Sequence, residues 1–167
     1  MANDKRIFGS GKVRVGNVGA TLTDVSNGVG DVQSASLDIQ YQKKDLMNSP
    51  EISNFPVLTK YYGGKVDFKL SFENLNRDVM ARSTGMTSAT SGGVVTLTLV
   101  KNAAPGFYRL EWEGVDVDGQ PVLITIFNAS APGLGLALTL DDYGKSDITV
   151  SGYPDSSGNV CTIASAA

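Results

Sequence analysis

Strict alternation of apolar and polar side chains over residues 65–73 constrains the fold of this chain more than any other feature. Val66, Phe68, Leu70 and Phe72 alternate with charged or hydroxyl residues through nine consecutive positions. Successive side chains of a β-strand point to opposite faces, so this period places the four apolar groups on one face. We therefore expect a strand here with one face against a core.

Shorter segments with the same period recur along the chain and are separated by turn-forming residues. The pair Asp118-Gly119 is typical of a hairpin turn, whereas residues 86–93 are predicted to form a loop. The pattern indicates about eight or nine strands, and hence a mainly β chain that folds as a β-sandwich or barrel. The other expected strands are residues 11–16, 31–41, 94–100, 107–117, 121–127, 134–140, 146–152 and 159–164.

One short flanking α-helix is expected at about residues 75–84. Leu75 and Val79 are four residues apart and share a helical face, and Asp78 precedes Arg82 by four residues in the favourable order. Gly85 suits the position just after a helix. No repeat or linker divides the chain, so residues 1–167 are interpreted as a single domain.

Residues 40–65 interrupt the pattern with about twenty-five residues that lack a clear period. Because neighbouring strands usually pair antiparallel, we expect a long β-hairpin arm at about residues 42–63, able to reach about 40 Å. Pro50 and Pro56 are expected to stiffen it and to block regular pairing. An equally weighted alternative is that the stretch folds back over its own core. The candidate residues for contact with another subunit are Leu46, Met47, Ile52, Phe55, Val57, Leu58, Tyr61 and Tyr62.

Composition argues against most catalytic and metal-binding chemistry. The chain has no His and one Cys, which excludes His-based triads, His-ligated metals and an intrachain disulfide. Gly-Lys-Ser at residues 144–146 lacks the earlier Gly of a phosphate loop, and residues 116–119 lack the later ligands of a calcium loop. We therefore expect no enzyme activity, catalytic residue, metal or cofactor.

The amino-terminal residues contain no apolar signal region, and no apolar run approaches the length of a membrane span. We therefore expect synthesis in a cytoplasm and no membrane partner. Residues 1–100 carry 11 Lys+Arg and 9 Asp+Glu, a balance of +2, whereas residues 101–167 carry 3 and 8, a balance of −5. This asymmetry is either chance or two faces of opposite sign that suit head-to-tail stacking.

The strands that flank the arm each have one polar face. In a ring of identical subunits, such strands could pair edge to edge and close a large barrel whose polar faces line a channel. The candidate channel-lining residues are Ser34, Ser36, Asp38, Gln40, Lys65, Asp67, Lys69, Ser71 and Glu73.

The order of these features resembles that of the major tail tube proteins of long-tailed bacteriophages. The resemblance rests on the segments at residues 11–40 and 63–85, the arm between them, and the acidic run at residues 136–152. It implies a virion protein, made in the bacterial host, that assembles into stacked hexameric rings around a channel for genome delivery. The implied partners are further copies of the chain, tape measure, tail tip and terminator proteins, and DNA in transient passage.

Two other interpretations stay open. The chain could be a β-sandwich binding or decoration module of a virion, or the inner tube protein of a contractile injection system. A sugar-binding module needs exposed aromatic side chains, and the one tryptophan, Trp112, lies on the apolar face of its expected strand. A low pI of about 4.8 and the lack of a basic patch suit DNA passage better than DNA binding.

Overall fold

The computed structural model describes residues 11–24, 32–47, 56–72, 81–82, 84–131, 134–137 and 145–165. Strands dominate these residues, which confirms the mainly β class expected from the alternation. The strands are β1 (Lys12–Gly16), β2 (Thr23–Asp24), β3 (Val32–Met47), β4 (Pro56–Phe72), β5 (Thr87–Ser91), β6 (Val94–Thr98), β7 (Tyr108–Val115), β8 (Pro121–Ser130), β9 (Leu134–Ala137), β10 (Lys145–Tyr153) and β11 (Cys161–Ser165).

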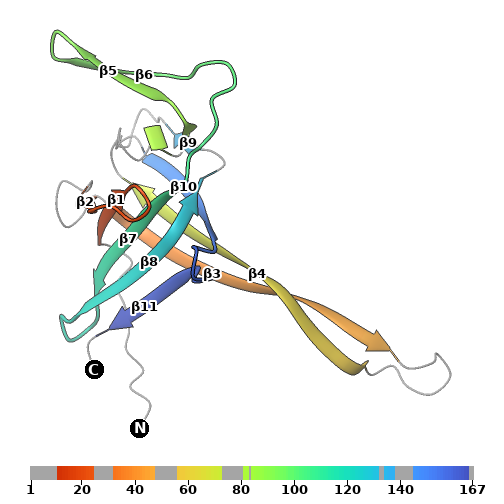
Figure 1. Ribbon diagram of the computed structural model, residues 1–167. Helices are drawn as coiled ribbons and strands as arrows, with labels where there is room; N and C mark the ends of the chain where they lie inside the picture. The colour runs from red at the N-terminus through yellow and green to blue at the C-terminus, as the bar shows by residue number, and fades with distance from the viewer. Residues whose placement is uncertain are drawn as a thin grey trace.

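Nine of the described strands form one antiparallel sheet (Figure 1). Its main order is β2-β1-β7-β8-β10-β4-β3, with β11 paired to β8 and β9 paired to β10. A bridge between Gly11 and Val32 joins the start of β1 to the start of β3. The sheet therefore curls until two of its strands, distant in the sheet order, meet at one point.

The predicted alternation places the core on one face of this sheet. On β4, Val66, Phe68, Leu70 and Phe72 are all buried, as expected from the sequence. Similar apolar faces on β1, β7, β8 and β10 complete the core. Burial of each such side chain contributes roughly 1.5–3 kcal/mol relative to exposure, so this shared face is the main stabilising feature.

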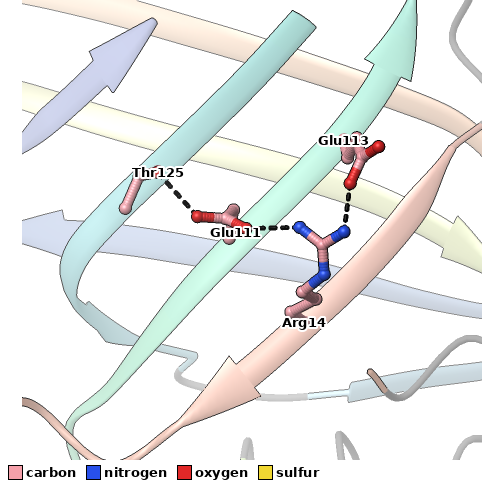
Figure 2. Close-up of polar contacts among 4 residues, drawn as sticks. All are labelled: Arg14, Glu111, Glu113 and Thr125. Atoms are coloured by element: carbon pink, nitrogen blue, oxygen red, sulfur yellow. Dashed lines mark hydrogen bonds and ion pairs between the residues drawn. The ribbon is translucent and has the colours of Figure 1, made fainter. Parts of the chain in front are cut away.

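An ion-pair cluster ties β1 to β7 on the opposite face (Figure 2). The Arg14 guanidinium lies 2.6 Å from Glu111 Oε1, and it also donates to Glu113. From β8, Thr125 Oγ1 donates to the other oxygen of Glu111 at 3.5 Å. The hydrogen bond to Glu111, reinforced by Glu113, raises the pKa of Arg14. These carboxylates are therefore engaged in holding strands together.

The loop predicted at residues 86–93 is wrong, because β5 and β6 form a separate hairpin. Thr87 lies opposite Thr98, and Ser91 lies opposite Val94. The turn residues Gly92 and Gly93 have φ of 57° and 79°, as a two-residue type I′ turn requires. Strand β5 consists of Thr, Ser and Ala and has no large apolar side chain on either face. Thr favours strands, but a search for alternating apolar residues does not detect such a segment.

The expected helix at about residues 75–84 falls largely outside the described residues. Residues 81, 82 and 84 are helical, and Gly85 has φ 71°, the conformation that often follows a helix. The rest of the helix stays a prediction. Within the described ranges, no helix combines the length and the apolar character required to span a membrane.

Candidate functional site

The polar face expected for a channel lies on the paired strands β3 and β4. Their register places Ser34 opposite Ser71, Ser36 opposite Lys69, Asp38 opposite Asp67, and Gln40 opposite Lys65. Asp67 and Ser71 are half-buried, and the other six side chains are exposed. Glu73 lies outside the described residues. The structure thus brings eight of the nine candidates into one continuous surface.

Strand β10 extends this surface with residues that the sequence analysis did not select. Asp147 lies opposite Ser71, Thr149 opposite Lys69, and Ser151 opposite Asp67. Their alternation with the buried Ile148 and Val150 was visible in the sequence. The pairing of β10 with β4 was not, because these strands are far apart in the chain.

Short polar contacts organise the middle of the surface. Lys65 Nζ lies 2.7 Å from Asp67 Oδ2, and Ser151 Oγ donates to Asp67 Oδ1 at 2.8 Å. Beside them, Gln40 Nε2 donates to Asp38 Oδ2 at 2.6 Å. Desolvation pushes the pKa of Asp67 upward, but the hydrogen bonds from Lys65 and Ser151 outweigh it and leave that pKa lowered. Asp67 is therefore held ionised despite facing Asp38 across the strands.

The surface carries a small negative balance. Of the described candidates on this surface, Asp38 and Asp67 offset Lys65 and Lys69, which sums to zero. Adding Asp147 from β10 makes three acids against two lysines, or −1. Because Lys65 is paired with Asp67, its ammonium is partly neutralised. The surface is hydroxyl-rich and weakly acidic, with no cluster of cations that would hold phosphate.

On the apolar face of the β3–β4 hairpin, side chains become more exposed from the core toward the arm. Leu37 is half-buried, whereas Ile39 and Tyr41 are 42% and 69% exposed. Tyr61, opposite Lys43, is 66% exposed. Strands β3 and β4 remain paired out to Met47 and Pro56, and Figure 1 shows them projecting from the rest of the sheet. The described part of the arm continues outward and does not fold back.

The arm candidates are placed unevenly by the structure. Leu46 lies opposite Leu58, and Tyr62 lies opposite Gln42, within the paired strands. Ile52 and Phe55 lie outside the described residues. The expected block to pairing at Pro56 is wrong: Pro56 opens β4 opposite Met47, and the first residue of a strand tolerates Pro. The remaining candidate, Val57, lies in β4 next to this residue.

Gly63 makes a bulge at the root of the arm. Tyr41 pairs with Gly64 and Gln42 pairs with Tyr62, so Gly63 is an extra residue on β4, with φ 62°. Such bulges bend a strand and increase its twist. The bulge also changes which β4 residues share a face with the body, because strand faces alternate with a period of two.

We expect Gly63→Ala to loosen the arm. The new Cβ meets nothing within 4 Å, so the cost is the left-handed backbone alone, about 1–2 kcal/mol. Hydrogen exchange should become faster for amides of residues 42–47 and 56–62. Gly64→Ala is the matched control, because its Cβ makes only ordinary contacts at 3.7 Å and no left-handed φ is involved. Equal exchange in the two variants would contradict the assignment of the bulge.

The outer edge of β3 is open beyond its bridge at Val32. In the part of the chain that the structure describes, β4 is the one strand that pairs with β3. The open edge extends from Ser34 to Met47 and continues into the arm. The same described residues contain no group of three or more potential metal-ligating side chains.

The fold of this chain is similar to that of a protein of known structure. The chain matches a chain of the anti-feeding prophage cap, the AFP tube terminating cap, with a TM-score of 0.55 and 13% identity over 99% of this chain and 100% of that one. The two chains share one fold. No protein-family model and no curated protein matches the sequence.

Two further solved structures show weaker similarity. One is the tail of an empty GTA particle, with a TM-score of 0.48 and 5% identity over 94% of this chain and 96% of that one. The other is the PVC sheath–tube complex of an extracellular contractile injection system in its extended state, with a TM-score of 0.48 and 10% identity over 93% and 89%.

Proposed function

We propose that this chain is a structural subunit of a virion tail, whose copies form stacked hexameric rings around a channel that passes DNA. The observation that carries the proposal is the open edge of β3, which continues into the projecting arm. A long unpaired edge offers backbone donors and acceptors to another chain. A ring of copies that pair along this edge closes the sheet and removes the exposed edges.

The polar face of β3, β4 and β10 supports a channel lining. It is hydroxyl-rich and weakly acidic, with the balance of −1 counted above for the described residues. DNA passage requires weak contact, whereas binding would need clustered cations that release counterions from phosphate. The proposed lining residues are the sequence candidates together with Asp147, Thr149 and Ser151.

The arm supplies the second contact between copies. From Tyr41 to Met47 the paired strands span about 20 Å at roughly 3.3 Å per residue, before the turn region. That length reaches well into a neighbouring subunit. Tape measure, tail tip and terminator proteins are the further partners that this assignment entails.

The likeness to the tube terminating cap favours a second candidate, a cap that ends a tube. An inner tube protein of a contractile injection system would share the same contacts with a different surrounding apparatus. Trp112 is 2% exposed, so a carbohydrate-binding decoration module could not use this tryptophan as a sugar platform.

Electron microscopy of the concentrated protein tests the proposal. We expect hollow tubes with a regular axial repeat and six-fold rings in cross-section. Isolated rings that do not stack would favour the cap. A protein that remains monomeric at every concentration, including in the presence of preformed tube fragments, would contradict both.

A further inference from the structure

The β5–β6 hairpin is a two-stranded sheet that no other described strand joins. All of β5 is exposed, and in β6 only Val95 and Leu97 are half-buried. An isolated two-stranded hairpin is marginally stable at best in water. Among the described strands, both edges of the hairpin are therefore unpaired, and most of its side chains are exposed.

The hairpin lacks the usual protection of open strand edges. Residues 86–100 contain no Asp, Glu, Lys, Arg or Pro, although 19% of the chain is charged. Charged residues and prolines normally keep exposed edges from pairing with other chains. Val94, Leu99 and Val100 are 64%, 60% and 50% exposed. Such a segment is suited to a surface that another polypeptide covers.

A mainly apolar groove lies at the root of the arm. It has a volume of about 610 Å³ and a mainly apolar lining from β3, β4, β10 and the start of β11. Ile39, Tyr41 and Tyr153 contribute side chains that are 42%, 69% and 46% exposed. The charged residue in this lining, Lys65, holds its ammonium 2.7 Å from Asp67. The groove therefore presents no uncompensated charge.

We propose that the β5–β6 hairpin of one copy docks in this arm-root groove of a second copy. The inference rests on the proposed function and specifies one contact between copies. Burial of two uncharged apolar surfaces removes apolar area from water and leaves no ion unpaired. Figure 1 shows the hairpin at one end of the molecule and the arm and β11 extending toward the other. The contact is thus head-to-tail and propagates from copy to copy.

The composition of the hairpin favours an identical copy over a different protein. Residues 86–100 contain no charged residue, and interfaces between identical subunits are more apolar than those of transient complexes and depleted in charge at their core. Main-chain pairing and small apolar groups give modest affinity at each contact. A modest contact suffices when many copies repeat it, because linked contacts reinforce one another.

Disulfide trapping tests the contact, since Cys161 is the one cysteine of the chain and lines the groove. Val94→Cys places a second thiol at the hairpin tip. Copper–phenanthroline oxidation of assembled protein should yield disulfides between positions 94 and 161 of different copies, seen as a ladder on non-reducing gels and assigned by peptide mass spectrometry. Burial raises the pKa of the Cys161 thiol, so the reaction is run at mildly alkaline pH.

Val117→Cys is the matched control, because Val117 is 54% exposed at the turn between β7 and β8. We expect at least tenfold less linkage to Cys161 from position 117 than from position 94. Adding Cys161→Ser to Val94→Cys should abolish the ladder. In a separate pair of variants, Val94→Glu should need at least a tenfold higher protein concentration for assembly than Val117→Glu. The circular dichroism spectrum should show that both variants are folded.

The outcomes separate this contact from the proposed function. Tubes that form without linkage between positions 94 and 161, or that tolerate Val94→Glu as well as Val117→Glu, overturn the hairpin contact alone. A ladder without tubes or rings supports the contact and contradicts the tube. If copies neither associate nor cross-link, both proposals are wrong.

Discussion

Replacement of residues 45–59 by Asn-Gly should give a folded protein that no longer assembles. Lys44 lies opposite Lys60, so a two-residue type I′ turn can close the shortened hairpin without disturbing the register below it. The core residues of β4 begin at Val66, beyond the deletion. We expect thermal unfolding within a few degrees of the parent protein. Sedimentation and electron microscopy should show loss of tubes at concentrations at least a hundredfold above those at which the parent assembles.

The control keeps the full arm and its charges. Lys44→Arg with Lys60→Arg preserves length, register and charge at the same two positions, so it should assemble as the parent does. If the shortened protein still builds tubes of the parent's diameter and repeat, the arm does not make the contact assigned to it. The β3 edge and the β5–β6 hairpin contact would then carry the association.

Trp112→Ala should cause the largest loss of stability of any single substitution in the body of the protein. Trp112 is 2% exposed and contacts the Phe68 ring edge-to-face, with centroids 6.4 Å apart. Gly114 has no Cβ where one would lie 2.1 Å from the indole, so the surroundings are shaped around this ring. We expect a loss of about 3–5 kcal/mol in the free energy of unfolding. At 2–4 °C per kcal/mol, the midpoint should fall by roughly 6–20 °C by circular dichroism.

Two further variants distinguish packing from general damage to β7. Trp112→Phe should lose much less than the alanine variant, because it keeps an aromatic ring and the indole nitrogen has no hydrogen-bond partner among the described residues. Val115→Ala, at a position that is 43% exposed on the same strand, should stay within about 0.5 kcal/mol of the parent. A similar loss for Val115→Ala and Trp112→Ala would show that the strand, and not the indole, is the sensitive feature.

Much of the candidate site could be predicted from local pattern. The period of two in residues 65–73 and 31–41 assigned Phe68 and Leu70 to the core and Ser36 and Lys69 to the polar face. It could not assign Asp147, because its place beside Ser71 depends on the pairing of β10 with β4. It predicted a strand at residues 94–100, where β6 lies, but it missed the partner β5, whose strand propensity comes from Thr and not from an apolar face.

The sequence by itself determined which side chains face the core, since the alternation of a strand is a local property of neighbouring residues. Tertiary structure alone decided which strands become neighbours, that Gly63 and not Gly64 takes the left-handed conformation, and which edge stays open. Those outcomes depend on contacts between residues far apart in the chain, and no short segment contains the information that selects among them.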